Sequence, residues 1–146
     1  MTKYKIAIAS DHAGFFLKKE LLEYLIQSNY QVMDLGTFNE ESVDYPEFGH
    51  KAASVIQDGS ADFGIICCGT GIGIGIVANK HQGVRAAVCH NVLTARLSRA
   101  HNDANILALG SRVIDINVAK DCLKVFLSTP FEGGRHERRI EQIDLI

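Results

Sequence analysis

The chain has 146 residues, a formal net charge of −2 and an apolar content of 47%. This length predicts one domain, residues 1–146, with a sizeable core, and the apolar content argues against disorder. The nearly balanced charge provides no positive field to attract nucleic acid, so no nucleic-acid partner is expected. No apolar run reaches about 18 residues, the length of a membrane span, so no membrane association is expected either.

Short apolar runs alternate with segments of helical periodicity along the whole chain. The runs at residues 4–10, 31–36, 63–68, 84–89 and 105–110 predict five buried strands. Apolar residues at helical spacing lie between and after them, and the tail at 135–146 is expected to form a short polar helix. Uniformly apolar strands that alternate with helices predict a parallel sheet covered on both faces, a three-layer α/β/α sandwich of Rossmann-like type.

Ligands of such folds bind at the carboxyl ends of the strands. The residues that follow the first, third and fifth predicted strands are therefore the candidates for a site. These are the segments "SDHAG" at 10–14, "CGTGIG" at 68–73 and "GSR" at 110–112.

The glycines at 69, 71, 73 and 75 follow the third strand and open a helix. Residues 73–78 match the dinucleotide pattern G-x-G-x-x-A, but they follow the third strand rather than the first, and the chain is short for two nucleotide-binding halves. We interpret the loop as a cradle for a small anion or an oxyanion, because backbone N–H groups point outward there. The alternative is a tight packing turn.

The four cysteines, Cys67, Cys68, Cys89 and Cys122, form no CxxC pair and have no spacing typical of zinc ligands. Together with an N-terminus that lacks a secretory signal, this predicts a cytoplasmic protein without disulfides or metal. Cys68 directly precedes the glycine loop, where a thiolate is favoured. Its neighbour Cys67 points to the opposite face of the strand and is expected in the core. Either cysteine, taken alone, is also compatible with inert packing.

Several polar residues near the strand ends are further candidates. Asp11 and His12 suit a hydroxyl-rich or phosphorylated ligand, although Asp11 is equally suited to capping the next helix. Histidine side chains in general can exchange protons near neutral pH, so His101 is a candidate for moving protons, and Asn102 is a candidate for binding a hydroxyl. The candidates for binding phosphate are Arg112, Arg135 and Arg139. The last two lie in a charged tail, which is also compatible with a merely solvated helix face.

In combination, these segments are far more specific than each is alone. The chain contains, in order, "SDHAGFFLK", "DYP", "CGTGIG", "SRAHNDANILALGSR" and "FEGGRHERR". It closely resembles, over essentially its whole length, the type B ribose-5-phosphate isomerase family, which also includes galactose-6-phosphate isomerase subunits. The resemblance implies interconversion of ribose 5-phosphate and ribulose 5-phosphate through an enediolate, with no cofactor or metal. It also implies a homodimer or homotetramer with shared active sites.

The resemblance also implies residue roles. Cys68 matches the base that moves a proton between C1 and C2, and His101 matches the group that opens the sugar ring. The matching positions for substrate binding are Asp11, His12, Tyr45, Gly69, Thr70, Gly71, Ile72, Gly73, Asn102, Arg112, Arg135 and Arg139. Some family members use a glutamate where this chain has Ile74, so Cys68 is expected to carry the proton here.

Two alternatives remain open at this level. The first is an isomerase of a six-carbon sugar phosphate, such as allose 6-phosphate or galactose 6-phosphate. The second is a nucleotide- or phosphate-binding module without catalysis, against which the complete acid–base pair of Cys68 and His101 argues.

Overall fold

The computed structural model describes residues 3–144 and contains one five-stranded parallel sheet. The strands are β1 (Lys5–Ser10), β2 (Gln31–Asp34), β3 (Phe63–Cys68), β4 (Ala86–Val88) and β5 (Ile106–Gly110). Their order across the sheet is β2-β1-β3-β5-β4, and every neighbouring pair is parallel. The predicted three-layer α/β fold with five parallel strands is confirmed.

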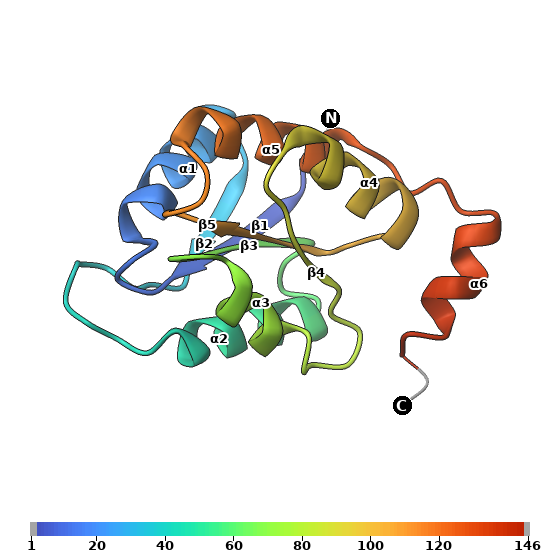
Figure 1. The fold of residues 1–146 in the computed structure, drawn as a ribbon, viewed down its shortest axis with the longest axis horizontal. Helices are drawn as coiled ribbons and strands as arrows, with labels where there is room; N and C mark the ends of the chain where they lie inside the picture. The colour runs from blue at the N-terminus through green and yellow to red at the C-terminus, as the bar shows by residue number, and fades with distance from the viewer. Residues whose placement is uncertain (1–2, 145–146) are drawn as a thin grey trace.

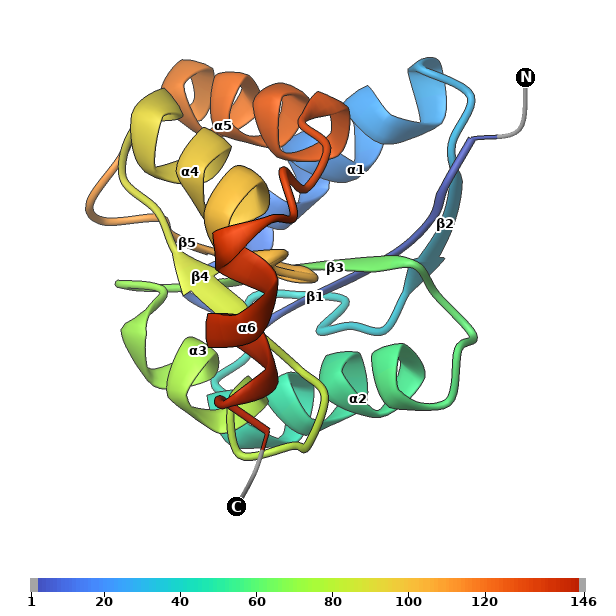
Figure 2. The same cartoon turned by 90° about the vertical axis from the view of Figure 1, so that its right-hand side faces the viewer.

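The helices are α1 (Phe15–Gln27), α2 (Tyr45–Gln57), α3 (Ile72–Ala78), α4 (Val92–Asn102), α5 (Ile116–Ser128) and α6 (Arg135–Glu141). Helices α1, α4 and α5 cover one face of the sheet, and α2 and α3 cover the other (Figure 1). Figure 2 shows the same three layers end-on, with α6 lying across the end of the sheet. None of the helices described within residues 3–144 has the length and apolarity needed to span a bilayer.

The core consists of two apolar clusters, one on each face of the sheet. Ile65 and Cys67 pack toward α1 and α5, whereas Ile66 and Cys68 pack toward α2 and α3. All six residues of β3 are buried, as expected for a central strand with helices on both faces.

The element boundaries differ from the sequence-based predictions mainly at the periphery. The fourth strand is shorter than predicted, because it lies at the sheet edge and pairs only with β5. The helix after the glycine loop ends at Ala78 rather than near Lys80, where tight turn bonds from Lys80 to Val77 and from His81 to Ala78 take over. The tail is helical over Arg135–Glu141, and residues 145 and 146 of its predicted helix lie outside the described part of the chain.

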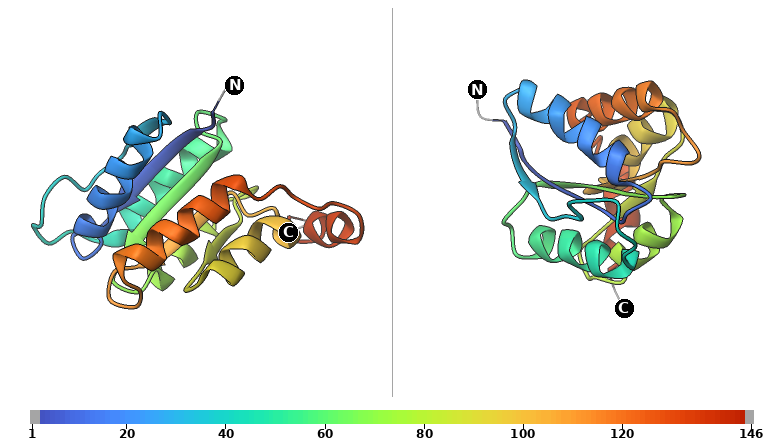
Figure 3. Two further views of the ribbon diagram at one scale, coloured as in Figure 1. Left: turned by 90° about the horizontal axis from the view of Figure 1, so that it is seen from above. Right: turned by 90° about the vertical axis from the view of Figure 1, so that its left-hand side faces the viewer.

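Helix α6 stands apart from the three layers. Figure 3 shows it projecting beside the C-terminal end of α4, with which it is in contact. The segment that leads to it contains Gly133 and Gly134, both with positive φ (69° and 57°). These left-handed conformations turn the chain away from α5 before the last helix begins.

Candidate functional site

The loop between β3 and α3 brings backbone donors to the thiol of Cys68. The Gly71 N–H donates a hydrogen bond to the Cys68 Sγ over 3.1 Å. Gly71 has φ 79°, and a Cβ there would lie 2.9 Å from the Leu109 carbonyl carbon. Glycine is therefore required by both conformation and space, and the N–H it directs at sulfur stabilises negative charge there.

The two adjacent cysteines occupy different environments, as the alternation of side chains along β3 predicts. Cys67 is fully buried among the apolar side chains beneath α1 and α5. Burial raises the pKa of the Cys67 thiol far above its usual range. Cys68 is 4% exposed and lies at the end of the strand, directly before the loop. The structure thus places Cys68, and not Cys67, beside the loop donors.

Arg112 lies against the same loop. Its backbone N–H donates to the Gly69 carbonyl over 2.9 Å, and the Ser111 N–H donates to the Cys68 carbonyl over 2.9 Å. Its guanidinium Nη1 is 3.1 Å from the position that a Cβ on Gly69 would take. The guanidinium therefore packs over the residue that follows Cys68, where it adds a positive charge to the loop.

Asp11 and His12 follow β1, the strand beside β3. The Asp11 Oδ1 accepts a hydrogen bond from the Gly14 N–H over 2.9 Å, and the Asp11 N–H donates to the Cys67 carbonyl over 3.3 Å. His12 Nδ1 accepts from the Val43 N–H over 3.1 Å. Asp11 thus orders the turn before α1 but does not cap the helix, because the N-cap is Gly14 and the helix has no side-chain cap hydrogen bond. This turn sits next to the end of β3.

Tyr45 begins α2 and packs over the glycine loop. A Cβ on Gly73 would lie 2.7 Å from the Tyr45 ring, so the ring's position depends on the missing side chain. Tyr45 is 39% exposed, which leaves part of its ring accessible from solvent. The following predicted residues therefore come together at the carboxyl edge of the sheet, and we call them the carboxyl-edge group: Asp11, His12, Tyr45, Cys68, Gly69, Thr70, Gly71, Ile72, Gly73 and Arg112.

The other four predicted site residues lie at the opposite edge. His101 and Asn102 end α4 immediately before β5, whereas Arg112 follows β5. The five residues of β5 span roughly 17 Å at about 3.3 Å per residue, which separates the two edges. Arg135 and Arg139 are on α6 beside α4, four residues apart on one helix face as predicted. One chain therefore does not unite His101 with Cys68.

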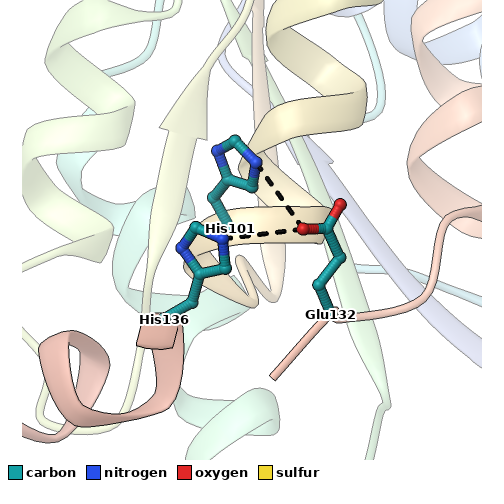
Figure 4. A group of neighbouring side chains, drawn as sticks. All are labelled: His101, Glu132 and His136. Atoms are coloured by element: carbon teal, nitrogen blue, oxygen red, sulfur yellow. Dashed lines mark ion pairs between the residues drawn. The ribbon is translucent and has the colours of Figure 1, made fainter. Parts of the chain in front are cut away.

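His101 instead belongs to a cluster with Glu132 and His136, shown in Figure 4. Its ring stacks on that of His136 with centroids 4.3 Å apart and an interplanar angle of 14°. The Glu132 Oε1 lies 3.9 Å from His101 Nε2 and 3.6 Å from His136 Nε2. Burial, His101 and Arg135 lower the pKa of His136 below its ordinary value. Among the described residues, these are the one group of at least three His, Cys, Asp or Glu side chains whose donor atoms lie close enough to share a metal ion.

The sequence reasoning singled out neither Glu132 nor His136. Both lie in the quoted segment "FEGGRHERR", four residues apart, but Glu132 precedes α6 and is held by a backbone bond from its N–H to the Ala100 carbonyl. The i,i+4 spacing of a carboxylate and an imidazole was the available signal. This spacing becomes informative only once it is known that the end of α4, which carries His101, lies beside Glu132 and His136, and the spacing itself does not show that.

Comparisons with known proteins cover nearly the whole chain. The family described as Ribose/Galactose Isomerase matches residues 6–143. The ribose-5-phosphate isomerase B of Escherichia coli is 46% identical over 97% of this chain and 95% of its own. A crystal structure of a ribose 5-phosphate isomerase from Thermotoga maritima has a TM-score of 0.97 and 52% identity, covering 99% of this chain and 100% of that one.

A third relative was solved with a sugar phosphate. The ribose-5-phosphate isomerase B of Mycoplasma genitalium, with bound ribulose-5-phosphate, has a TM-score of 0.92 and 42% identity. The match covers 95% of this chain and 93% of that one. These matches cover the segments at both edges of the sheet, including the carboxyl-edge group and helix α6.

Proposed function

The chain belongs to the ribose/galactose isomerase family, and we propose that it interconverts ribose 5-phosphate and ribulose 5-phosphate. The names of its relatives support this substrate pair. The observation that carries the proposal is the carboxyl-edge group, in which a nearly buried thiol, loop N–H groups and a guanidinium converge at the end of β3. These are the groups that an aldose–ketose isomerisation needs.

In the proposed reaction Cys68 is the base. Its thiolate removes the proton from C2 of open-chain ribose 5-phosphate, and the electron pair of that C–H bond forms the enediolate as the C1 carbonyl oxygen takes up negative charge. The proton of the C2 hydroxyl then passes to the C1 oxygen, the thiol returns its own proton to C1, and the carbonyl forms at C2. Aldose and ketose are isomers, so the reaction consumes no oxidant or reductant.

The loop N–H groups of residues 69–73 are proposed to stabilise the enediolate oxygens. Donors fixed in advance at a developing oxyanion contribute about 3–4 kcal/mol each in other enzymes. The close packing of the loop on β5 fixes them here, since a Cβ on Gly110 would lie 2.5 Å from the Thr70 carbonyl. Asp11, His12 and Tyr45 surround this loop and are proposed to bind the sugar hydroxyls.

The proposed ring-opening group, His101, must come from a second copy of the chain. Ribose 5-phosphate is mostly a closed ring, and a histidine that donates a proton to the ring oxygen releases the aldehyde. We propose a homodimer or a larger homo-oligomer in which His101, Asn102, Arg135 and Arg139 of one copy face the carboxyl-edge group of another. Arg112 and the two α6 arginines then bind the phosphate from both sides.

Exposed apolar side chains support a second copy at this position. They lie on α3, at the start of α4 and just after β5, all near the carboxyl edge: Ile72, Ile76, Val92, Leu93 and Val113. All five are at least 39% exposed in the single chain. Burying apolar side chains at a self-complementary contact stabilises a symmetric assembly.

We propose the cytoplasm as the site of this activity. All four cysteines are free and buried, and a thiol base requires the reducing conditions that keep Cys68 in its sulfhydryl form.

Two measurements test the proposal. The first compares kcat/KM for ribose 5-phosphate with that for allose 6-phosphate and galactose 6-phosphate; a preference for either six-carbon substrate would contradict the assignment. The second uses cyclic ribose 5-phosphate as substrate and mixes two variants expected to be inactive toward it, Cys68→Ala and His101→Asn, after unfolding and refolding them together. If a dimer shares its sites, half of the dimers are hybrids with one intact site, and about a quarter of the activity returns. If no activity returns, each site lies within one chain.

A further inference from the structure

We propose that His101, Glu132 and His136 form a binding site for Zn²⁺, and that zinc bound there inhibits the enzyme. The binding part rests on the cluster in Figure 4 alone. The inhibitory part rests on the proposed function, because it assigns ring opening to His101. Two imidazoles and one carboxylate also form the protein ligand set of known zinc sites that keep a fourth position open.

The spacing of the donor atoms is close to what zinc requires. Zinc lies about 2.0–2.2 Å from nitrogen and carboxylate oxygen, so donors around one tetrahedral ion are about 3.3–3.5 Å apart. The Glu132 Oε1 is 3.6 Å from one imidazole nitrogen and 3.9 Å from the other, and all donor atoms lie within 4.8 Å of one another. An ion at the centre therefore has to draw the donors together by about 1 Å or less on each side.

The cluster combines one fixed ligand with two adaptable ones. The His136 side chain is only 10% exposed, whereas those of His101 and Glu132 are 36% and 56% exposed. The two rings are stacked, so one of them has to turn before both nitrogens point at the same ion. The His101 ring is accessible enough to rotate, and the exposed Glu132 side chain can move with it to keep its carboxylate beside the imidazole nitrogen.

The ligand types select among metals. Imidazole nitrogen favours zinc and neighbouring transition metals, whereas Mg²⁺ and Ca²⁺ prefer oxygen donors. The guanidinium groups of Arg135 and Arg139, on the same helix as His136, oppose any cation. We therefore expect binding of Zn²⁺ that is reversed by a chelator, and no comparable binding of Mg²⁺.

Two other parts of the described chain also offer zinc donors and have to be distinguished. His50 Nδ1 is 2.6 Å from His81 Nε2, but Gln57 is the third group there, and its neutral amide adds no charge. Cys68 offers a thiol, but that side chain is 4% exposed and accepts the Gly71 N–H. The cluster of His101, Glu132 and His136 differs from both because it combines a carboxylate with two imidazoles.

Zinc at this site acts on only one step of the proposed reaction. It occupies the His101 Nε2 lone pair, so the imidazole no longer carries a proton to the sugar ring, while the Cys68 thiol is not among the three ligands. Inhibition is therefore expected to be strong with ribose 5-phosphate, which is mostly cyclic. It is expected to be weaker with ribulose 5-phosphate, which has no furanose ring to open.

The test is a calorimetric titration of the full chain with ZnCl₂, and separately with MgCl₂, in buffer without phosphate. We expect one zinc ion per chain, and Glu132→Gln and His136→Asn should each weaken zinc binding at least about tenfold. Glu137→Gln on α6 and His81→Asn serve as matched controls and should bind zinc as the wild type does. Initial rates in both reaction directions, with and without ZnCl₂, measure the inhibition.

Each outcome separates the two proposals. Zinc binding that is unchanged in both Glu132→Gln and His136→Asn, or lost in His81→Asn, overturns the site. Binding that depends on Glu132 and His136 without inhibition overturns the inhibitory role and the ring-opening role of His101, but leaves the site. A wild-type chain without isomerase activity overturns the proposed function, and the titration still decides whether zinc binds.

Discussion

The adjacent cysteines of β3 provide a matched pair of substitutions. Cys67→Ala and Cys68→Ala each remove one sulfur atom from a side chain that is 0% or 4% exposed. Loss of a buried group of this size costs about 1 kcal/mol of unfolding free energy. For a chain of this length that lowers the unfolding temperature by roughly 2–4 °C. We expect the two variants to be destabilised alike.

Their activities should differ sharply. Cys68→Ala removes the proposed base, and general bases contribute about 10²–10⁴ to rate, so kcat should fall by that factor. Cys67→Ala leaves the loop side of the strand unchanged and should keep kcat within roughly threefold, because its effect is confined to the core beneath α1 and α5.

The decisive assay is proton exchange at C2. The protein is incubated with sugar phosphate in deuterated water, and deuterium incorporation is followed by NMR alongside isomerisation and thermal unfolding. Cys68→Ala should lose both exchange and isomerisation, and Cys67→Ala should keep both. Normal exchange in Cys68→Ala, or an equal loss in the two variants, would refute the assignment of the base.

Two further predictions concern the loop and a histidine pair. Gly110→Ala places a Cβ 2.5 Å from the Thr70 backbone, so it should displace the loop and lower kcat by roughly tenfold to a hundredfold. The control Gly59→Ala, whose Cβ meets nothing within 4 Å, should lower the free energy of unfolding by about 1 kcal/mol because of its positive φ, and should leave kcat unchanged. Equal kcat values in the two variants would contradict the role of the loop. Burial and His50 lower the pKa of His81, so the unfolded chain takes up this proton first on acidification, and stability present above about pH 6.5 is lost as the pH falls. The fall in unfolding temperature between about pH 7.5 and about pH 5.5 should therefore be smaller in His81→Asn than in the wild type, whereas the exposed control His90→Asn should behave as the wild type does.

Hydrophobic patterning and residue positions along the chain were enough to predict the sheet, its layers and one half of the candidate site. Strands that are apolar on both faces have to be covered on both faces, which made the parallel three-layer fold predictable. Side chains alternate along a strand, so Cys67 and Cys68 had to face opposite sides of the sheet, and its place directly before the glycine loop made Cys68 the candidate for the site. The carboxyl ends of parallel strands lie at one edge, so the positions of Asp11, Cys68 and Arg112 just after three strands predict that they come together there.

The location of the other half of the candidate site depends on how distant segments of the chain pack together. His101 ends a helix that runs antiparallel to the strands, so it lies at the amino edge, a strand length away from Cys68. Its contact with Glu132 and His136 depends on how α6 packs against α4 after a turn through two glycines with positive φ. Local periodicity specifies the faces of a helix, but not which distant segment a backbone turn brings against it. For that reason the cluster of His101, Glu132 and His136 emerges only from the folded chain.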